Sequence, residues 1–107
     1  MKRGDVWWVD FDPSIGGEIQ KLRPAVIVSN DAANKYLNRV QVLPLSSAVD
    51  KIYPSEARVT FNGKAGKAMA DQLTTVSKLR LSRFGGRLTP EEMHDIERAI
   101  RLQLDLF

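Results

Sequence analysis

Two stretches of the sequence end in side chains that suit chemistry on a phosphate group. Arg23 follows the polar, glycine-bearing stretch 14–22 and opens the apolar stretch 24–28. A second apolar stretch, 40–45, ends in the hydroxyls of Ser46 and Ser47. A guanidinium offers a planar fork of donors that fits phosphate oxygens, and a hydroxyl adds a further donor. Held close together, these groups favour RNA chemistry that requires no metal ion.

Cleavage of RNA requires no nucleophile from the protein, because the ribose 2′-OH can attack the adjacent phosphate and leave a 2′,3′-cyclic phosphate and a 5′-OH. The protein must help to remove one proton, supply another and stabilise the charge that develops on phosphorus. Glu18 and Arg23 are candidates for the proton transfers, but arginine is a poor base, so charge stabilisation is the preferred role of Arg23. Gln72 can read a base edge or hold a ribose hydroxyl, and Asp71 precedes it.

Each of these residues also has a structural interpretation. An arginine before a proline at a strand edge is commonly structural, and two serines after a strand commonly form a turn. Asp71 can accept hydrogen bonds from backbone N–H groups at a strand end, and Gly16 and Gly17 can simply permit loop movement. Residue type and spacing leave both interpretations open.

Composition excludes several other kinds of site. There is no cysteine, so disulfides and thiolate-ligated metals are impossible, and the only histidine, His94, lies among acidic neighbours at an expected solvent-exposed position. A histidine pair or a Ser-His-Asp triad cannot form within one protomer, a zinc site is not expected, and no glycine-rich nucleotide-binding motif is present. We therefore expect no metal and no cofactor.

The elements that hold these side chains are predicted to be short strands. Aromatic and β-branched stretches, alternation and turn residues predict strands at 6–11, 24–29, 39–45, 57–61 and 67–72, with one more within 79–88. The stretch 24–29 is apolar throughout and is expected to be central in the sheet, with Pro24 at its start. Asn62 and Gly63 predict a type I′ hairpin turn.

The C-terminal stretch predicts one amphipathic helix. Thr89 as N-cap, Pro90 at the first helical position and Glu92 at the third make a capping box. The apolar side chains that then recur at helical spacing are Met93, Ile96, Ile100, Leu104 and Phe107. The chain, residues 1–107, is therefore expected to be a single, mainly β (α+β) domain with a strongly bent antiparallel sheet or partial barrel and a C-terminal helix.

The formal net charge is only +3, but the charges are unevenly placed. Residues 58–87 carry seven basic side chains against Asp71 alone, whereas residues 88–107 carry two basic and five acidic ones. The basic segment can face a polyanion or serve solubility alone. No apolar stretch approaches the roughly 20 residues of a membrane helix, and no signal peptide is recognisable, so a cytoplasmic protein is expected.

Aromatic side chains are candidates for contact with unpaired bases. Trp7 and Trp8 are strand neighbours and point to opposite faces, so one is expected in the core and the other at a surface or interface. Trp7, Trp8, Tyr53 and Phe61 are all possible stacking partners for single-stranded RNA.

The whole chain resembles the MazF/PemK (Kid) family of bacterial toxin endoribonucleases. The segments that carry the resemblance are, in order, Arg3-Gly4-Asp5-Val6-Trp7, Asp10-Phe11-Asp12-Pro13, Gly16 and Glu18, Arg23-Pro24-Ala25-Val26, Val42-Leu43-Pro44-Leu45-Ser46-Ser47 and Ala70-Asp71-Gln72. The resemblance implies an SH3-like bent barrel that works as a homodimer. It also implies sequence-specific, metal-independent cleavage of single-stranded RNA, chiefly mRNA, and a cognate antitoxin whose disordered C-terminal segment covers the RNA sites.

The resemblance implies roles for individual residues. Arg23 matches the catalytic arginine, and Ser46 matches a position that is usually threonine. Serine keeps the hydroxyl but lacks the β-branch that stiffens χ1, so Ser47 can share the role. Glu18 matches an acidic residue of a mobile loop that takes part in RNA binding or catalysis. The predicted RNA-binding residues are Gln20, Lys21, Ser47, Asp71 and Gln72.

Some features separate this chain from its relatives or leave other functions open. Gly17 and Leu22 occupy positions that carry histidine in some relatives, so any role of those histidines is absent here. A non-enzymatic toxin of the same fold, which binds a protein target such as DNA gyrase, is the main alternative, and a binding module without catalysis is another. The combination of Arg23 and Ser46 argues for the enzyme.

Overall fold

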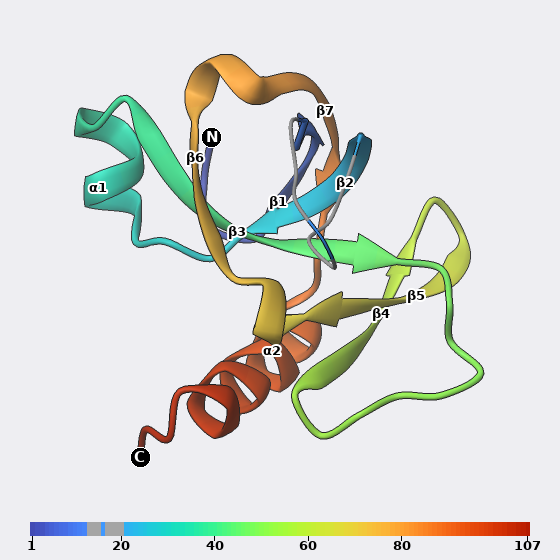
Figure 1. Ribbon diagram of the computed structural model, residues 1–107. Helices are drawn as coiled ribbons and strands as arrows, with labels where there is room; N and C mark the ends of the chain where they lie inside the picture. The colour runs from blue at the N-terminus through green and yellow to red at the C-terminus, as the bar shows by residue number, and fades with distance from the viewer. Residues whose placement is uncertain (13–15, 17–20) are drawn as a thin grey trace.

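The structure, a computed structural model, describes residues 1–12, 16 and 21–107. Within these residues a strongly curled antiparallel sheet forms a half-barrel, and the C-terminal helix α2 (Pro90–Gln103) packs against one side of it (Figure 1). The predicted mainly β fold with a C-terminal helix is confirmed. Two predicted site residues, Glu18 and Gln20, lie outside the described residues, as does Gly17.

The sheet in the described part of the chain has the strand order β4-β5-β3-β2-β1-β7, and β6 also pairs with β3. The strands are β1 (Asp5–Asp10), β2 (Leu22–Ile27), β3 (Arg39–Ser46), β4 (Glu56–Phe61), β5 (Lys64–Met69), β6 (Thr74–Ser77) and β7 (Leu81–Arg87). The apolar strand β2 lies between β1 and β3, so its predicted central place is confirmed. Pro24 is the third residue of β2 rather than the first, and pairing with β3 begins one residue later, at Ala25.

Strands β4 and β5 form the hairpin that Asn62 and Gly63 predicted. Phe61 pairs with Lys64, and both loop residues have positive φ (53° and 73°), as a type I′ turn requires. The predicted limits of β5, 67–72, were wrong because a two-residue loop returns the chain to the ladder at once. Asp71 and Gln72 instead form part of a short 3₁₀ helix, η1 (Ala70–Gln72).

Three short elements were not predicted: β6, the helix α1 (Asp31–Tyr36) and the 3₁₀ helix η2 (Lys78–Arg80). The N-cap of α1 is regular, because the Asn30 side chain accepts a hydrogen bond from the Ala33 N–H at 2.9 Å. The residue that α1 buries is the polar Asn34, so the helix has no apolar periodicity to reveal it. β6 has only four residues, too few for a recognisable alternation.

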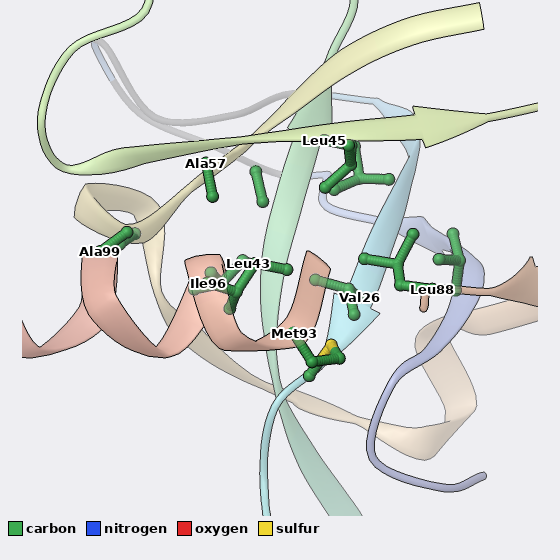
Figure 2. Close-up of a cluster of buried hydrophobic side chains, with 12 residues drawn as sticks. Val26, Leu43, Leu45, Ala57, Leu88, Met93, Ile96 and Ala99 are labelled. Atoms are coloured by element: carbon green, nitrogen blue, oxygen red, sulfur yellow. The ribbon is translucent and has the colours of Figure 1, made fainter. Parts of the chain in front are cut away.

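The curled sheet is buried on both faces, which explains why β2 is apolar at successive positions. Val26 belongs to a cluster that α2 covers, whereas its neighbours Ala25 and Ile27 belong to a second cluster on the opposite face. Figure 2 shows the first cluster, in which Ile96 and Met93 of α2 lie against the side chains of the sheet. This packing holds the sheet in a curved form, and the curvature brings one end of each of the strands β2, β3 and β4 into the same region.

Helix α2 begins as predicted and ends earlier than predicted. The Thr89 hydroxyl accepts from the Glu92 N–H at 3.1 Å, and the Glu92 carboxylate accepts from the Thr89 N–H at 2.9 Å. The helix ends at Gln103, and Leu104 and Phe107 are exposed rather than buried because Asp105 turns the chain with a φ of 56°. His94 is 81% exposed, which confirms its expected place in solvent. No helix in the described residues combines the length and apolar character needed to span a membrane.

Candidate active site

A pocket of about 320 Å³ opens beside the C-terminal end of β3, with the β4–β5 hairpin on one side and β2 and β1 on the other. Its polar lining residues are Arg23, Ser46, Ser47, Asn62 and Lys64. Its apolar walls include the rings of Trp8 and Phe61. The two groups that the sequence singled out for phosphate chemistry, a guanidinium and a hydroxyl, therefore share one cavity.

The pairing of β2 with β3 places Arg23 and Ser46 near the same end of the two strands. Ala25 pairs with Pro44 across these antiparallel strands. These are the last paired residues, and Arg23 and Ser46 lie two residues beyond them, on the same face of the sheet as Ala25 and Pro44 because side chains alternate between faces. Each is half-buried and lines the pocket. Ser47 follows Ser46 into the pocket lining but is more exposed.

The hydroxyl of Ser46 is held by the chain that follows it. Its Oγ accepts a hydrogen bond from the Ala48 N–H at 3.1 Å, and the hydroxyl proton can still be donated to a ligand. On the β5 side, a Cβ added to Gly66 would lie 3.1 Å from the Ser46 carbonyl oxygen. Glycine at position 66 therefore lets β5 approach closely to the C-terminal end of β3.

Trp8 forms an aromatic edge of the pocket. Its ring lies 6.0 Å from that of Phe61, and the Arg83 guanidinium lies 4.8 Å from the Trp8 ring centroid. Trp7 points to the opposite face, where it contacts Phe84 edge-on at 5.9 Å and packs against the second core cluster. The predicted split of the two tryptophans between faces is confirmed, although both are only partly buried.

The other described site residues lie outside this pocket. Lys21 is exposed immediately before β2, and its N–H donates to the Asp12 carboxylate at 2.8 Å. Asp71 and Gln72 follow the far end of β5, whose first three residues line the pocket. No residue of η1 lines the pocket. Arg23, Ser46 and Ser47 therefore line one pocket, whereas Lys21, Asp71 and Gln72 lie outside it.

Comparison with known proteins identifies the family. Residues 2–104 match the family described as the PemK-like, MazF-like toxin of type II toxin–antitoxin systems. The chain belongs to this MazF-like family. It is 38% identical over 116 aligned residues to the endoribonuclease MazF9 of Mycobacterium tuberculosis, covering 100% of this chain and 98% of that protein. It is 31% identical to the endoribonuclease MazF of Staphylococcus saprophyticus, covering 99% and 92% of the two chains.

Solved structures agree with this assignment. A mycobacterial endoribonuclease in complex with its cognate antitoxin superposes with a TM-score of 0.84 at 26% identity, over 100% of this chain and 97% of that one. MazF of Deinococcus radiodurans gives a TM-score of 0.87 at 23% identity, covering 99% and 97%, and so shares the fold. The chain is a MazF-like endoribonuclease toxin of a type II toxin–antitoxin system.

The basic segment of this MazF-like toxin does not form one continuous cationic surface. Four of its seven basic side chains bind other protein groups, namely Lys67, Lys78, Arg80 and Arg87. The other three, Arg58, Lys64 and Arg83, are exposed. Lys64 lines the pocket and Arg83 stacks at its edge. The fold therefore leaves two exposed cations of this segment at or beside the pocket, Lys64 in its lining and Arg83 against Trp8.

Sequence reasoning missed the hairpin side of the site. Asn62, Lys64 and Gly66 line the pocket because β5 pairs with β3 through Leu45–Ala68 and Ser46–Lys67. The Asn62-Gly63 turn signal located the hairpin itself but carried no information about which strand the hairpin would join. Trp8 and Phe61 were candidate stacking residues among four, and the pocket distinguishes them from Trp7 and Tyr53.

Proposed function

We propose that this toxin cleaves single-stranded RNA, chiefly mRNA, at specific sequences and without a metal ion, and that the scissile phosphate binds in the pocket of Arg23 and Ser46. The endoribonuclease class follows from the family and the relatives. The observation that carries the finer proposal is the placement of a guanidinium and a hydroxyl in the lining of one cavity.

In the proposed reaction the ribose 2′-oxygen forms a bond to phosphorus while the bond from phosphorus to the 5′-oxygen breaks. The 2′-OH loses its proton and the departing 5′-oxygen gains one, which leaves a 2′,3′-cyclic phosphate and a 5′-OH. Arg23 donates to the phosphate oxygens as their charge grows, and the Ser46 hydroxyl adds a donor. Glu18, outside the described residues, stays our sequence-based candidate for proton transfer.

Single-stranded RNA suits the pocket because unpaired bases can stack on exposed rings. Trp8 and Phe61 offer such rings beside the proposed phosphate site, and Lys64 and Arg83 offer cations at its mouth. Ser47 and Lys21 are proposed to contact the RNA backbone on either side of the scissile phosphate. Gln72 and Asp71 can meet the same RNA only where the strand extends beyond the pocket or where a second protomer supplies them.

We also propose that the toxin is a homodimer that acts in the cytoplasm and is neutralised by a cognate antitoxin. The mycobacterial relative was solved with its antitoxin, which supports the last point. Apolar side chains at the end of α2 and beyond it are exposed and suit burial against a second chain, namely Leu102, Leu104, Leu106 and Phe107. Light scattering during size exclusion should give twice the 12.0 kDa chain mass, and a monomer would contradict this part.

The deciding experiment for cleavage uses antitoxin-free protein, a long single-stranded RNA and EDTA. Mapping of the new 5′ ends should show discrete sites that carry 5′-OH termini. Cleavage that disappears on chelation would contradict the metal-independent mechanism. Intact RNA together with trapped gyrase–DNA complexes would instead support the non-enzymatic toxin, and RNA binding without cleavage would support a binding module.

A further inference from the structure

The loop 47–55, which joins β3 to β4, is held by a buried ion pair. Lys67 Nζ lies 3.0 Å from the Glu56 carboxylate, and the two side chains are only 9% and 8% exposed. Lys67 Nζ also donates to the Lys51 carbonyl at 3.0 Å. The same carboxylate oxygen of Glu56 accepts from the Tyr53 N–H at 2.8 Å. Two backbone groups of the loop therefore converge on one ion pair.

This ion pair stands beside the candidate active site. Lys67 pairs directly with Ser46 across β3 and β5, so the two side chains project from the same face of the sheet. Ser46 is also the residue from which the loop departs, and its Oγ accepts from Ala48 within that loop. The path of the loop and the orientation of the hydroxyl are thus coupled through residues 46–53.

An ion pair at this position is not explained by stability alone. Lysine and glutamate are almost never fully buried unless paired, and a well-packed apolar pair of similar volume commonly stabilises a fold at least as well. An apolar pair, however, cannot donate to the Lys51 carbonyl and accept from the Tyr53 N–H. Lys67 and Glu56 therefore fix the path of the loop that follows Ser46.

We propose that Lys67 and Glu56 are positioning residues, which orient the Ser46 hydroxyl for RNA cleavage by anchoring the loop 47–55. This inference rests on the proposed role of Ser46. It assigns a function to a lysine that the charge distribution of the sequence had grouped with possible RNA-binding cations. Lys67 acts through the loop and not through contact with RNA.

The main test is the double substitution Glu56→Gln/Lys67→Met in the full chain. It leaves no buried charge unpaired, and the glutamine oxygen can still accept from Tyr53, so the change removes the anchor on Lys51. We expect kcat on a single-stranded RNA to fall about tenfold to a hundredfold, as for displaced catalytic groups, with KM changed less than about threefold. Lys67→Arg, which keeps a cationic donor, should retain most of kcat.

A second pair of variants leaves Lys67 and Glu56 unchanged, and both variants lose the Tyr53 ring, whose centroid lies 5.8 Å from Lys67 Nζ. Tyr53→Pro removes the N–H that Glu56 accepts, whereas Tyr53→Ala keeps it and serves as the matched control. Tyr53 is exposed, so neither variant leaves a buried charge. We expect Tyr53→Pro to lower kcat and Tyr53→Ala to leave kcat within about twofold, together with faster amide hydrogen exchange in residues 47–53 of the proline variant.

A double-mutant cycle separates positioning from general damage. When the ion-pair variant is combined with Ser46→Ala, the two losses in kcat should not multiply, because both act through one hydroxyl. Fully multiplicative losses, or a folded ion-pair variant with kcat within about twofold of the parent, would overturn this inference alone. Unchanged cleavage in both Ser46→Ala and Ser47→Ala would overturn the proposed role of the hydroxyl, and this inference with it.

Discussion

Arg23 and Ser46 each lie two residues beyond Ala25 and Pro44, the last pair between the antiparallel strands β2 and β3, and both line the same pocket. Their position on one face of the sheet depends on a register in which Ala25 pairs with Pro44. A slip of one residue would turn one of the two side chains to the opposite face. The register is fixed because β2 buries Ala25 and Val26 in different core clusters. Packing on both faces of the sheet thereby sets the geometry of the site.

Arg23→Ala is expected to abolish most cleavage without loss of the fold. Removal of a donor aimed at developing charge commonly costs about 10²–10³ in kcat. Arg23→Lys should recover little, since an ammonium cannot present the planar fork of a guanidinium. The measurement is the initial rate on single-stranded RNA, with thermal unfolding as the test of folding. Arg39→Ala, at the opposite end of β3, is the matched control, and normal rates for Arg23→Ala would remove Arg23 from the mechanism.

Ser46→Ala is expected to slow cleavage more than Ser47→Ala. Both side chains line the pocket, but Ser46 is the more buried of the two. Ser46→Thr should keep the rate or raise it, because threonine supplies the same hydroxyl with a stiffer χ1. Rates of the three variants on one RNA decide the point. A larger loss for Ser47→Ala would transfer the role to Ser47.

The sequence predicted the strand ends that carry Arg23 and Ser46, because apolar runs that stop at polar residues are a local signal. It also predicted the Asn62-Gly63 turn and the capping box at Thr89, whose geometry depends on a few adjacent residues. The pairing of β5 with β3 depends instead on contacts between distant segments. The positions of Lys64, Gly66 and Lys67 around the site were therefore beyond local reasoning.

The difference between local signals and contacts between distant segments also explains where the structure departs from the sequence-based predictions. A positive charge on Lys67 suggested a polyanion partner, but the fold buries the side chain against Glu56. The predicted strand 67–72 placed Asp71 and Gln72 in the sheet, whereas both lie in η1 beyond the far end of β5, and their proposed role in RNA binding stays a prediction. The stripe Met93, Ile96 and Ile100 continued in sequence to Phe107, but the helix ends at Gln103. Periodicity alone does not show where a helix loses its packing partner.

Trp8→Ala is expected to weaken RNA binding by about 1–3 kcal/mol, the usual contribution of one stacked base. Trp8 forms the pocket wall with Phe61, and its ring can accept an unpaired base. Binding is best measured by fluorescence anisotropy in the Arg23→Ala background, where the RNA should stay intact. Tyr36→Ala removes an aromatic ring that is 77% exposed on α1 and is the control. Equal effects of the two substitutions would rule out a specific stacking role.

Ile96→Ala is expected to lower the free energy of unfolding by about 2–5 kcal/mol, as for other large-to-small changes in a packed core. Ile96 is fully buried in the cluster between α2 and the sheet (Figure 2). Leu79→Ala removes a side chain that is 96% exposed and should change stability by about 0.5 kcal/mol or less. Urea unfolding measures both. A small effect at Ile96 would mean that α2 contributes little to the curvature of the sheet.

RNA affinity is expected to fall steeply with salt, because each phosphate contact releases condensed counterions. Arg83 is exposed and stacks on Trp8, which lines the pocket, so we expect it to contact a phosphate next to the scissile one. Arg83→Gln should reduce the slope of log K against log salt by about 0.7, the value for one contact on a single strand. Arg101→Gln, an equal change of charge on the exposed face of α2, should leave the slope unaltered. A slope that both substitutions lower equally would show that net charge, and not a specific phosphate contact of Arg83 beside Trp8, determines how this toxin holds RNA.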